Sequence, residues 1–537
     1  MGAHRGDYDP AKGDREATVD QDQDPDPMGD APPGRHDRRA FLMSLGAGAA
    51  VVAGGLPALS LASAKRTSQS SRLLRELAAQ TKGPLLTRSS PGFRAAARVY
   101  NLRYSGVRPL AVLKAANESD VADAVRWAAQ NSIPITARSG GHSYAGYSTI
   151  ANGLVVDLTR LDQTSVNTRG RTARIGAGVQ LIDMYAALGR RGLTIPGGSC
   201  PSVGISGLAL GGGVGMAARR WGTTSDNLIS ARIVTADGII RTVDRSRYED
   251  LYWACRGGGG GNFGIVTSFR FRAHPARSAS WFFVDFDWSE AEAVVTRWQR
   301  WAPNAPDTLY SICALETGDG QPVVRAFGQY FGSEAGLRSQ LRGLTSAAEP
   351  TSLQVGSDSY INLMLLWAGC ADISLARCHT TGTSLDGTLP RESFFAKSAY
   401  VAKPMSSAGA RAMVRQIEIR QGQPTGSGAM LMDAYGGALN RPSPTATAFV
   451  HRDNICSIQS AAYWTGSAGA RQSIAWMQSQ YRAVAPYTSG RAYQNYIDPT
   501  LASWRRAYYG RNYDRLVDVK RRYDPDEVFR FKQGIPA

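Results

Sequence analysis

The fold of this chain can be predicted from the stretch Arg138-Ser139-Gly140-Gly141-His142-Ser143 and from the sequence on either side of it. The preceding run, Ile133–Ala137, has the composition of a short strand. Two glycines directly after a strand let backbone N–H groups close around an anion such as a pyrophosphate. A single loop histidine is usually bonded to nearby backbone, so His142 alone assigns no function.

The flanking sequence alternates between strand and helix patterns. Val107–Leu113 is predicted as a strand, and Ser119 as the N-cap of a helix whose apolar residues recur at helical spacing. Leu154–Leu158 and Thr172–Ala177 are predicted as further strands, and Leu181–Leu188 as a helix. Local β-α-β pieces of this kind predict an α+β domain.

A second glycine-rich stretch contains Cys200. It reads Gly197-Gly198-Ser199-Cys200-Pro201-Ser202-Val203-Gly204 and continues to Gly207 and Gly211-Gly212-Gly213. So much glycine indicates backbone lying against a large flat or phosphorylated ligand. Taken alone, Cys200 is better explained as a buried thiol or half of a disulfide. Residues 213–218 match a loose dinucleotide fingerprint, but no strand precedes them, which argues against that interpretation.

Two more motifs lie further along the chain, separated by a region with a different sequence pattern. Gly257–Gly261 opens onto a predicted strand, and Arg491-Ala492-Tyr493-Gln494-Asn495-Tyr496 lies near the end of the chain. Between them, Trp281–Asp287 and Leu309–Leu315 are predicted strands, whereas Leu337–Leu344 is a predicted helix. We therefore expect a separate substrate-facing domain of sheet and helices to begin at about residue 277.

Charge and cysteine content exclude several classes of protein. The formal net charge is +17, but the arginines are scattered, and no recognition helix, zinc spacing or stacking platform for nucleic acid accompanies them. Six cysteines are too few for a disulfide scaffold in a chain of 537 residues, and none forms a Cys-x-x-Cys pair. Cys370 and Cys378 could pair in an oxidising compartment, which the sequence leaves open.

Residues 1–64 are expected to lie outside the fold. Residues 1–37 are polar and have a disordered composition. Asp37-Arg38-Arg39-Ala40-Phe41-Leu42 and the weakly apolar run up to Ala64 resemble a twin-arginine export signal. The alternative is a retained anchor, which the Gly/Ala-rich composition and small-residue ending disfavour. We expect an exported protein without stable membrane insertion, whose true start is either Met1 or Met28.

In this order, the four motifs resemble the berberine bridge enzyme family of FAD-linked oxidases, within the vanillyl-alcohol oxidase fold. The resemblance runs from about residue 90 to the C-terminus, and the ending from Tyr508 to Pro536 is similar to the family's closing signature. It implies an α+β fold with a two-part FAD-binding domain, residues 65–276 and 490–537. Residues 277–489 would form the substrate domain, an antiparallel sheet covered by helices.

The resemblance also implies how FAD is held. In members with two covalent links, the histidine that matches His142 bonds to the flavin 8α-methyl group, and the cysteine that matches Cys200 bonds to flavin C6. The other residues that it implies for FAD binding are Arg138, Ser139, Gly140, Gly141, Ser143, Gly198, Val203, Gly204, Gly207, Gly264, Val266 and Asn495.

Catalytic residues are implied by the same resemblance. Tyr493 matches the tyrosine that acts as general base, which requires a lowered pKa or a proton relay because free tyrosine has a pKa near 10. Asp433 and Tyr435 resemble the segment that supplies a second polar partner, and which of them points inward stays open. Val203 resembles the residue of oxygen-reactive members. Leu208 departs from members that place a histidine there, so another donor must stabilise the reduced flavin.

The implied function is an FAD-dependent oxidase of alcohols on a sugar, glycoside or polycyclic natural product. Hydride would pass to flavin N5, and O2 would be reduced to hydrogen peroxide, without a metal. The alternatives are a dehydrogenase or an oxidative cyclase of secondary metabolism within the same family, or a secreted non-catalytic binding protein. Trp281, Trp288 and Trp367 could stack sugars or rings of the substrate, although core packing explains most such tryptophans.

Overall fold

A computed structural model describes residues 69–346 and 348–537. The chain divides into two units, Met1–Arg72 and Leu73–Ala537, and the second contains all the sheets of the described part. The expected leader and twin-arginine signal, residues 1–64, lie outside the described residues. Within the described part, no helix combines the length and the apolar character needed to cross a membrane.

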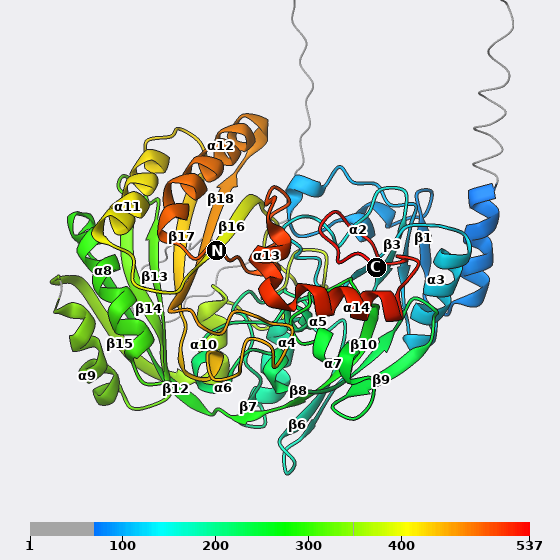
Figure 1. Cartoon of the computed structure of the whole chain (residues 1–537), viewed down its shortest axis with the longest axis horizontal. Coiled ribbons are helices and arrows are strands. Elements are labelled where there is room, and N and C mark those ends of the chain that lie inside the picture. Colours follow the sequence, from blue (N-terminus) through cyan, green and yellow to red (C-terminus); the bar gives the residue numbers. More distant parts are fainter. Residues whose placement is uncertain (1–68, 347) are drawn as a thin grey trace, which may run out of the picture. The chain divides into compact units, whose positions relative to one another are not determined.

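The first motif lies at the edge of a four-stranded sheet (Figure 1). Its strands lie in the order β1-β2-β4-β3, and β2, β4 and β3 are parallel. The elements are β1 (Leu85–Thr87), α2 (Phe93–Ala97), β2 (Ala111–Lys114), α3 (Glu118–Gln130), β3 (Ile135–Arg138) and β4 (Leu154–Asp157). Because β3 ends at Arg138, the loop that carries His142 begins at the carboxyl end of a parallel strand.

Two local predictions in this sheet are corrected by the structure. Asn117, and not Ser119, is the N-cap of α3, because the Asn117 side chain accepts the Asp120 N–H at 3.0 Å. Strand β2 begins only at Ala111, four residues later than predicted, and Pro109 within the predicted range has no N–H to donate to a neighbouring strand.

A five-stranded antiparallel sheet comes next in the chain, in the order β5-β6-β10-β8-β9. Its inner face is built from alternate apolar residues, such as Phe269 and Phe271 of β10, which are buried in the core that it shares with α4 and α7. The elements of this part are β5 (Thr164–Asn167), β6 (Thr172–Gly176), α4 (Leu181–Gly189), β7 (Leu193–Thr194), α5 (Ile205–Leu210), α6 (Ala218–Trp221), β8 (Leu228–Val234), β9 (Ile240–Asp244), α7 (Glu249–Ala254), β10 (Ile265–Arg272) and β11 (His274–Pro275).

The next part is a seven-stranded antiparallel sheet in the order β15-β12-β14-β13-β17-β18-β16. Helices α8, α9, α11 and α12 cover one of its faces (Figure 1). The elements are β12 (Ser278–Phe286), α8 (Ala291–Trp301), β13 (Leu309–Glu316), β14 (Val323–Tyr330), α9 (Glu334–Thr345), β15 (Pro350–Ser359), α10 (Tyr360–Trp367), β16 (Ser393–Val401), α11 (Ser407–Gln421), β17 (Ser427–Ala434), β18 (Cys456–Trp464) and α12 (Gly466–Val484). The expected α+β fold with a helix-covered antiparallel sheet is confirmed.

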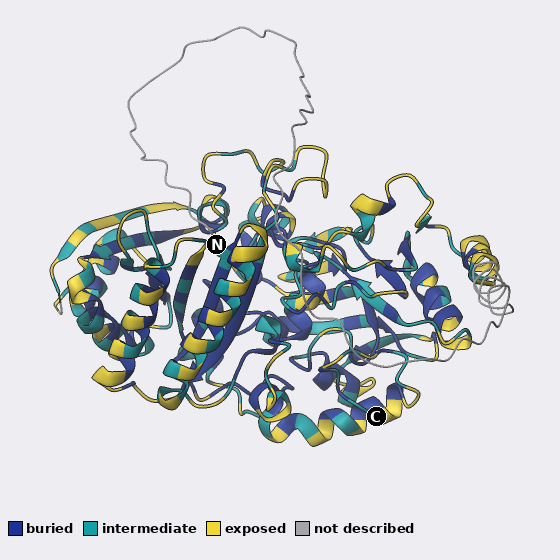
Figure 2. Cartoon of the chain, turned by 90° about the horizontal axis from the view of Figure 1, so that it is seen from above, coloured by how far each residue is buried: buried dark blue, intermediate teal, exposed yellow. Residues whose placement is uncertain are grey.

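Successive side chains in these strands point to opposite faces of the sheet, and the two faces have different surroundings. In β17, Met430, Met432 and Ala434 pack beneath the helices, whereas Leu431 and Asp433 point to the opposite face. The helices are amphipathic, with buried residues toward the strands and exposed residues outward (Figure 2). Asp433 is therefore presented on the face opposite α8, α9, α11 and α12.

The chain ends by returning to the first part of the fold. Helices α13 (Trp504–Tyr509) and α14 (Tyr513–Tyr523) are the last two, and α14 packs beside α7. Lys520 of α14 donates to the carbonyl of Asn262 at 2.8 Å, and the Asn262 side chain accepts the N–H of Ile535 at 2.9 Å. These contacts join the segment that follows the glycine run at 257–261 to the last residues of the chain.

Candidate functional site

The two glycine loops cross backbone to backbone. A Cβ atom at Gly140 would collide with the Gly204 nitrogen and the Ser202 oxygen, and one at Gly204 would collide with the Gly140 nitrogen and the Ser139 hydroxyl. Only glycine permits such an approach. The crossing brings the segments of His142 and Cys200 together, although they are far apart in sequence.

His142 lies between Ser202 and Tyr100. Its Nε2 is 2.9 Å from the Ser202 hydroxyl, and its ring stacks on Tyr100 with the centroids 4.0 Å apart. Burial, with a smaller effect from Arg391, lowers the pKa of His142 to about 3. The imidazole is therefore neutral at pH 7 and keeps a nitrogen lone pair that is available for bonding.

Cys200 is a free, partly exposed thiol on the second loop. Burial of its sulfur raises its pKa to about 11, while hydrogen bonds from Ser202 act in the opposite direction. A negative charge on Cys200 would also raise the pKa of Tyr100, which stacks on His142. Ser202 and Tyr100 thus connect the two residues predicted to hold the flavin.

The segment around Cys200 has the uncovered surface that a flavin requires. Most residues of 195–218 are buried, but Val203 and Leu208 are partly exposed and Gly207 is exposed. A Cβ atom at Gly207 would find no atom within 4 Å. Exposed apolar side chains beside bare backbone suit an apolar ring system and the phosphates attached to it. The residues present therefore fit FAD.

Several predicted FAD-binding residues support this surface from behind. The guanidinium of Arg138 is buried and donates to Asp157 at 2.6 and 3.0 Å. Ser139 donates to the carbonyl of Ala177 at 2.6 Å, and the Ser143 hydroxyl accepts the N–H of Tyr147 at 3.1 Å. The structure thus assigns their side chains to shaping the loop that carries His142.

Gly264 and Val266 lie in the core around β10 rather than on the uncovered surface. Gly264 has φ 152°, and a Cβ atom there would collide with the carbonyl of Val234 on the neighbouring strand. The Val266 side chain is buried. Gly198, by contrast, is partly exposed beside Leu208, within the uncovered surface.

The Tyr493 hydroxyl oxygen accepts two N–H groups. The backbone N–H of Gly213 donates to it at 2.8 Å, and the Asn495 amide donates at 2.9 Å. The same amide nitrogen lies 2.9 Å from the carbonyl of Leu208, on the uncovered surface. Burial raises the pKa of Tyr493 above its ordinary value, and the two donors offset only part of that rise by favouring the phenolate. Tyr493 and Asn495 are therefore brought together with the Cys200 segment.

Asp433 and Tyr435 differ in their environments. Asp433 is partly exposed, accepts the hydroxyl of Tyr310 at 3.0 Å, and has its pKa raised to about 7 by burial. A charge on Asp433 also raises the pKa of Tyr493, so the two groups interact. Tyr435 is fully buried, and its hydroxyl lies 3.0 Å from that of Tyr400. Of the two, Asp433 is the residue placed to meet a ligand.

Aromatic residues that were not among the predicted site residues complete the site. Tyr144 stacks on Tyr496 with the centroids 5.3 Å apart, and the edge of Tyr496 meets Tyr493 at 4.9 Å. The Tyr144 hydroxyl accepts the amide of Gln459 from β18 at 2.6 Å. Tyr144 and Tyr496 each lie within three residues of a predicted site residue, whereas nothing in the sequence marks Tyr100.

The three tryptophans considered for substrate stacking are taken up by packing. Trp367 is buried and donates to Gln329 at 2.9 Å. Trp288 packs against the helix-covered face and donates to Glu418 at 3.3 Å. Trp281 is partly exposed but lies directly over Gly356 of the neighbouring strand.

Other kinds of site have little support among residues 69–346 and 348–537. No group of three or more His, Cys, Asp or Glu side chains there is arranged to hold a metal ion. An open hollow lies on the outer face of the five-stranded sheet, lined by Arg174, Arg232, Arg270 and neighbouring polar residues. None of the predicted site residues lines it.

Comparisons with known proteins agree with this geometry. A sequence-family profile described as "FAD binding domain" matches residues 109–244, and one described as "Berberine and berberine like" matches residues 492–536. A Bacillus subtilis protein named "Uncharacterized FAD-linked oxidoreductase YgaK" is 34% identical over 461 residues, which are 84% of this chain and 97% of the relative. Fold, site and matches together define an FAD-linked oxidoreductase.

Solved structures narrow this class further. Physcomitrella patens BBE-like 1 is 32% identical, with a TM-score of 0.79 over 86% of this chain and 99% of the other. A chitooligosaccharide oxidase is 25% identical, with a TM-score of 0.77 over 86% and 99% of the two chains. The chain therefore belongs to the berberine bridge enzyme-like family of FAD-linked oxidoreductases.

Proposed function

We propose that this enzyme is an oxidase that holds FAD covalently through both His142 and Cys200 and oxidises an alcohol group of its substrate. The crossing of the two glycine loops supports a double attachment, because Ser202 and Tyr100 join the two residues within one neighbourhood. A neutral imidazole at His142 supports it further, because only the unprotonated ring nitrogen can form the bond.

The observation that carries the proposal is the Tyr493 oxygen, held by two N–H donors close to Asp433. FAD, when bound, supplies the hydride acceptor and passes the electrons on to O2, which gives hydrogen peroxide. Because burial holds the pKa of Tyr493 above its usual value, Tyr493 acts by a proton relay, taking the proton of the substrate hydroxyl as its own proton leaves. The Gly213 and Asn495 donors stabilise the negative charge that develops on its oxygen. Asp433 accepts the proton that leaves Tyr493, since its pKa of about 7 allows it to ionise near neutral pH.

A sugar, a glycoside or a polycyclic natural product is the proposed substrate. The similarity to a chitooligosaccharide oxidase supports a carbohydrate. The face of the seven-stranded sheet opposite α8, α9, α11 and α12 offers both polar and aromatic groups on the side of Asp433, among them Gln459 and Tyr463, which are partly exposed. A dehydrogenase or an oxidative cyclase is the alternative, and Val203 on the uncovered surface favours the oxidase because it resembles the residue of oxygen-reactive members.

We also propose that the enzyme is exported in its folded state by the twin-arginine route. The bond between Cys370 and Cys378 supports an oxidising destination, because such bonds are rare in the cytosol. Fusion of residues 1–64 to a reporter that leaves the cytosol only by this route tests the proposal. Replacement of Arg38 and Arg39 by lysine should abolish export.

The decisive experiment is a peroxide-release screen of sugars, glycosides and phenolic alcohols with the purified flavoprotein. For the substrate found, Tyr493→Phe should slow flavin reduction by about 100-fold or more while the bound flavin is retained, since general bases contribute about 10²–10⁴ in rate. Tyr252→Phe is the matched control, because Tyr252 is equally buried and donates to Leu228 at a distance from the site.

The outcomes separate the alternatives. Peroxide formed in proportion to product identifies an oxidase, whereas reduction of the flavin without peroxide identifies a dehydrogenase. A cyclised product identifies the cyclase. Unchanged flavin reduction in Tyr493→Phe would show that another residue removes the proton.

A further inference from the structure

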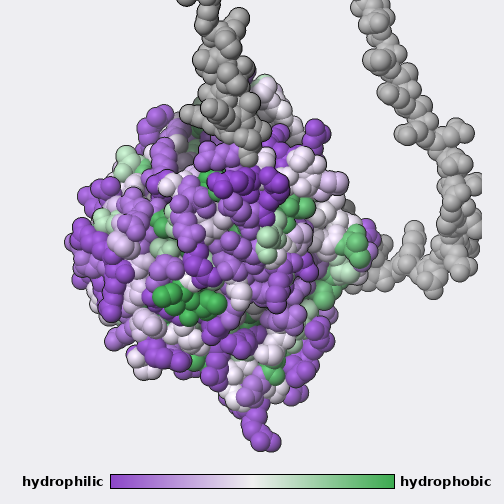
Figure 3. Space-filling view, turned by 90° about the vertical axis from the view of Figure 1, so that its right-hand side faces the viewer, coloured by the Kyte–Doolittle hydropathy of each residue, from purple (hydrophilic) through white to green (hydrophobic). Residues whose placement is uncertain are grey.

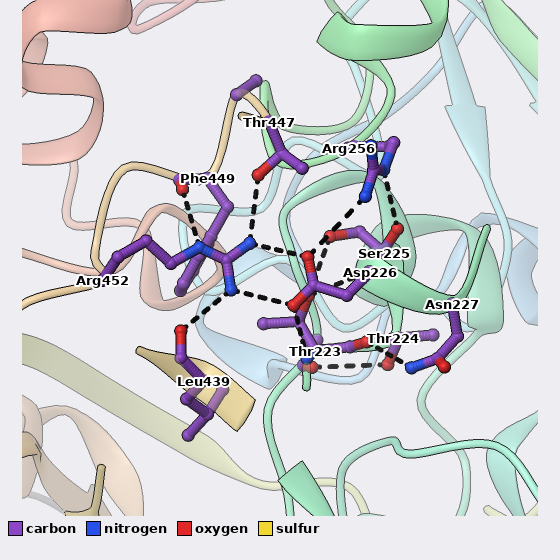
Figure 4. Close-up of polar contacts among 12 residues, drawn as sticks. Thr223, Thr224, Ser225, Asp226, Asn227, Arg256, Leu439, Thr447, Phe449 and Arg452 are labelled. Atoms are coloured by element: carbon purple, nitrogen blue, oxygen red, sulfur yellow. Dashed lines mark hydrogen bonds and ion pairs between the residues drawn. The ribbon is translucent and has the colours of Figure 1, made fainter. Parts of the chain in front are cut away.

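Arg452 uses every N–H donor of a guanidinium that is fully buried (Figure 4). It forms a two-pronged ion pair with Asp226, at 2.7 and 2.8 Å. Its remaining donors bind the carbonyl of Leu439 at 3.1 Å, the hydroxyl of Thr447 at 3.0 Å and the carbonyl of Phe449 at 3.3 Å. A buried charge with so complete a set of partners holds all of them in fixed positions.

Asp226 belongs to the first part of the fold, whereas Arg452 comes after β17 in the second. Burial alone would raise the pKa of Asp226, but Arg452 and the N–H of Thr223 hold it below its usual value, so Asp226 is ionised. A third charge, Arg256, lies 3.9 Å from the carboxylate and donates to the carbonyl of Ser225 at 3.1 Å. The ion pair therefore ties the turn at 223–226 to the second part of the chain.

That turn holds the glycine peptides beside Tyr493. The N–H of Ser225 donates to the carbonyl of Gly212 at 2.8 Å, and the N–H of Thr224 donates to the carbonyl of Gly213 at 2.9 Å. The N–H of Gly213 then donates to the Tyr493 oxygen at 2.8 Å. Gly212 and Gly213 have φ angles of 116° and 83°, a region in which glycine has great freedom. Their orientation therefore depends on these hydrogen bonds.

Phe449 holds the same peptides from another direction. Its carbonyl accepts from Arg452, and its N–H donates to the carbonyl of Arg256 at 3.1 Å. Its ring lies against Gly212, and its edge-to-face contact with Tyr493 has the centroids 5.9 Å apart. The ion pair thus fixes both the turn that holds Gly213 and the ring that packs against Tyr493.

We propose that Arg452 and Asp226 are positioning residues, which keep the Gly213 N–H directed at the Tyr493 oxygen during proton transfer. The inference rests on the proposed function, in which Tyr493 takes the substrate proton. Neither Arg452 nor Asp226 binds Tyr493 itself, so they act through the Thr224–Gly213 hydrogen bond and through Phe449. Loss of the pair leaves Tyr493 in place but frees the donor that stabilises negative charge on its oxygen.

The test compares Arg452→Lys and Asp226→Asn with the parent flavoprotein, by stopped-flow flavin reduction across pH. Each variant should retain its flavin and slow reduction about tenfold at pH 7, as expected for a weakened hydrogen bond to a charged oxygen. The deficit should stay constant up to pH 10 and shrink only above it, because burial holds the pKa of Tyr493 above its usual value and the phenolate forms by titration only there. Asp524→Asn is the matched control, since it breaks the equally buried Lys520–Asp524 pair away from Tyr493.

A double-variant comparison isolates the route of action. In a Tyr493→Phe background, Arg452→Lys should slow reduction less than about twofold further, because the oxygen that it serves is gone. A deficit that is equal at every pH, or that adds in full to that of Tyr493→Phe, would overturn the inference while leaving the role of Tyr493 intact. Unchanged reduction in Tyr493→Phe alone would overturn the proposed function, and the inference with it.

A milder variant keeps the inference testable if Arg452→Lys and Asp226→Asn fail to fold. Thr447→Val removes one of the acceptors of Arg452 and leaves the ion pair intact. It should give a smaller deficit that narrows in the same way with rising pH. If Thr447→Val folds with its flavin and shows no pH-dependent deficit, the inference is wrong.

Discussion

His142 and Cys200 differ in how readily each can bond to a flavin. Burial leaves His142 neutral, with a pKa of about 3, whereas burial raises the pKa of the Cys200 thiol to about 11. The unprotonated imidazole is the reactive form, while the protonated thiol is the unreactive one. At neutral pH we therefore expect His142 to be attached independently of Cys200, and Cys200 to be the more easily lost link.

This difference can be tested by single substitutions. Cys200→Ala should keep one covalent flavin, seen as a yellow acid precipitate with one FAD-sized mass increase. Cys200→Ser is the closer steric match and should behave alike. Recovery of all flavin in the acid supernatant from either variant would contradict separate attachments, and its recovery from the parent protein would contradict covalent binding altogether.

Asp433 gives the site a pH dependence. Its pKa is raised to about 7 from an ordinary 3.8, so the carboxylate needed as proton acceptor forms as pH rises through 7. Flavin reduction should therefore rise with pH around 7, and Asp433→Asn should be slow and lack that rise. Tyr435→Phe, which alters a buried neighbour whose hydroxyl bonds to that of Tyr400, should keep it. A rise that persists in Asp433→Asn would assign it to another group.

The raised pKa of Asp433 also makes the stability of the folded protein depend on pH. Because the folded-state pKa of Asp433 is the higher one, its protonation favours the folded protein, fully so below about pH 4. That contribution is lost as pH rises through 7. The Tm of Asp433→Asn minus the Tm of the parent should therefore be larger at pH 8 than at pH 4.

At the level of the elements, the crossing of the two glycine loops determines the site. Gly204→Ala would push a methyl group into the Gly140 backbone, and overpacking of this kind costs about 1–3 kcal/mol or more. Gly207→Ala, three residues later in α5, meets no protein atom within 4 Å. We expect Gly204→Ala to lower the apparent Tm, and Gly207→Ala to leave the fold intact but to reduce flavin content.

Circular dichroism and flavin absorbance, measured on the same samples, distinguish these effects. Equal flavin content in Gly207→Ala and the parent would mean that flavin does not cover this face of α5. An unchanged Tm in Gly204→Ala would mean that the two loops can move apart without loss of folding free energy.

The elements also show where sequence patterns suffice. Strands such as β6 and β13, and helices such as α4 and α9, can be predicted close to their observed bounds, because period and length are local properties. The N-cap at Asn117 is missed because Ser119 has equal intrinsic preference, and only the path of the backbone selects between them. The close packing of Gly264 beside β10 could not be predicted either, because it depends on Val234 of another strand.

In the molecule as a whole, two parts of the fold each contribute half of the site. The FAD-binding half supplies His142, Cys200 and the Gly213 N–H, whereas the seven-stranded sheet supplies Asp433. Tyr493 comes from the C-terminal segment, with its N–H bound to the Ser398 hydroxyl of β16 at 2.9 Å. The surface that the first half shows to solvent is mostly hydrophilic, with separated apolar patches (Figure 3).

Short stretches of sequence were enough to identify the family and FAD as its cofactor, because glycine spacing and the Tyr493 motif are local features. Packing between distant segments was needed to show that Asp433 rather than Tyr435 borders the site and that Arg138 serves Asp157. It was needed equally for the link from Arg452 and Asp226 to the donor of Tyr493. Burial and hydrogen-bond partners arise between segments hundreds of residues apart, so no local pattern records which side chains will meet there.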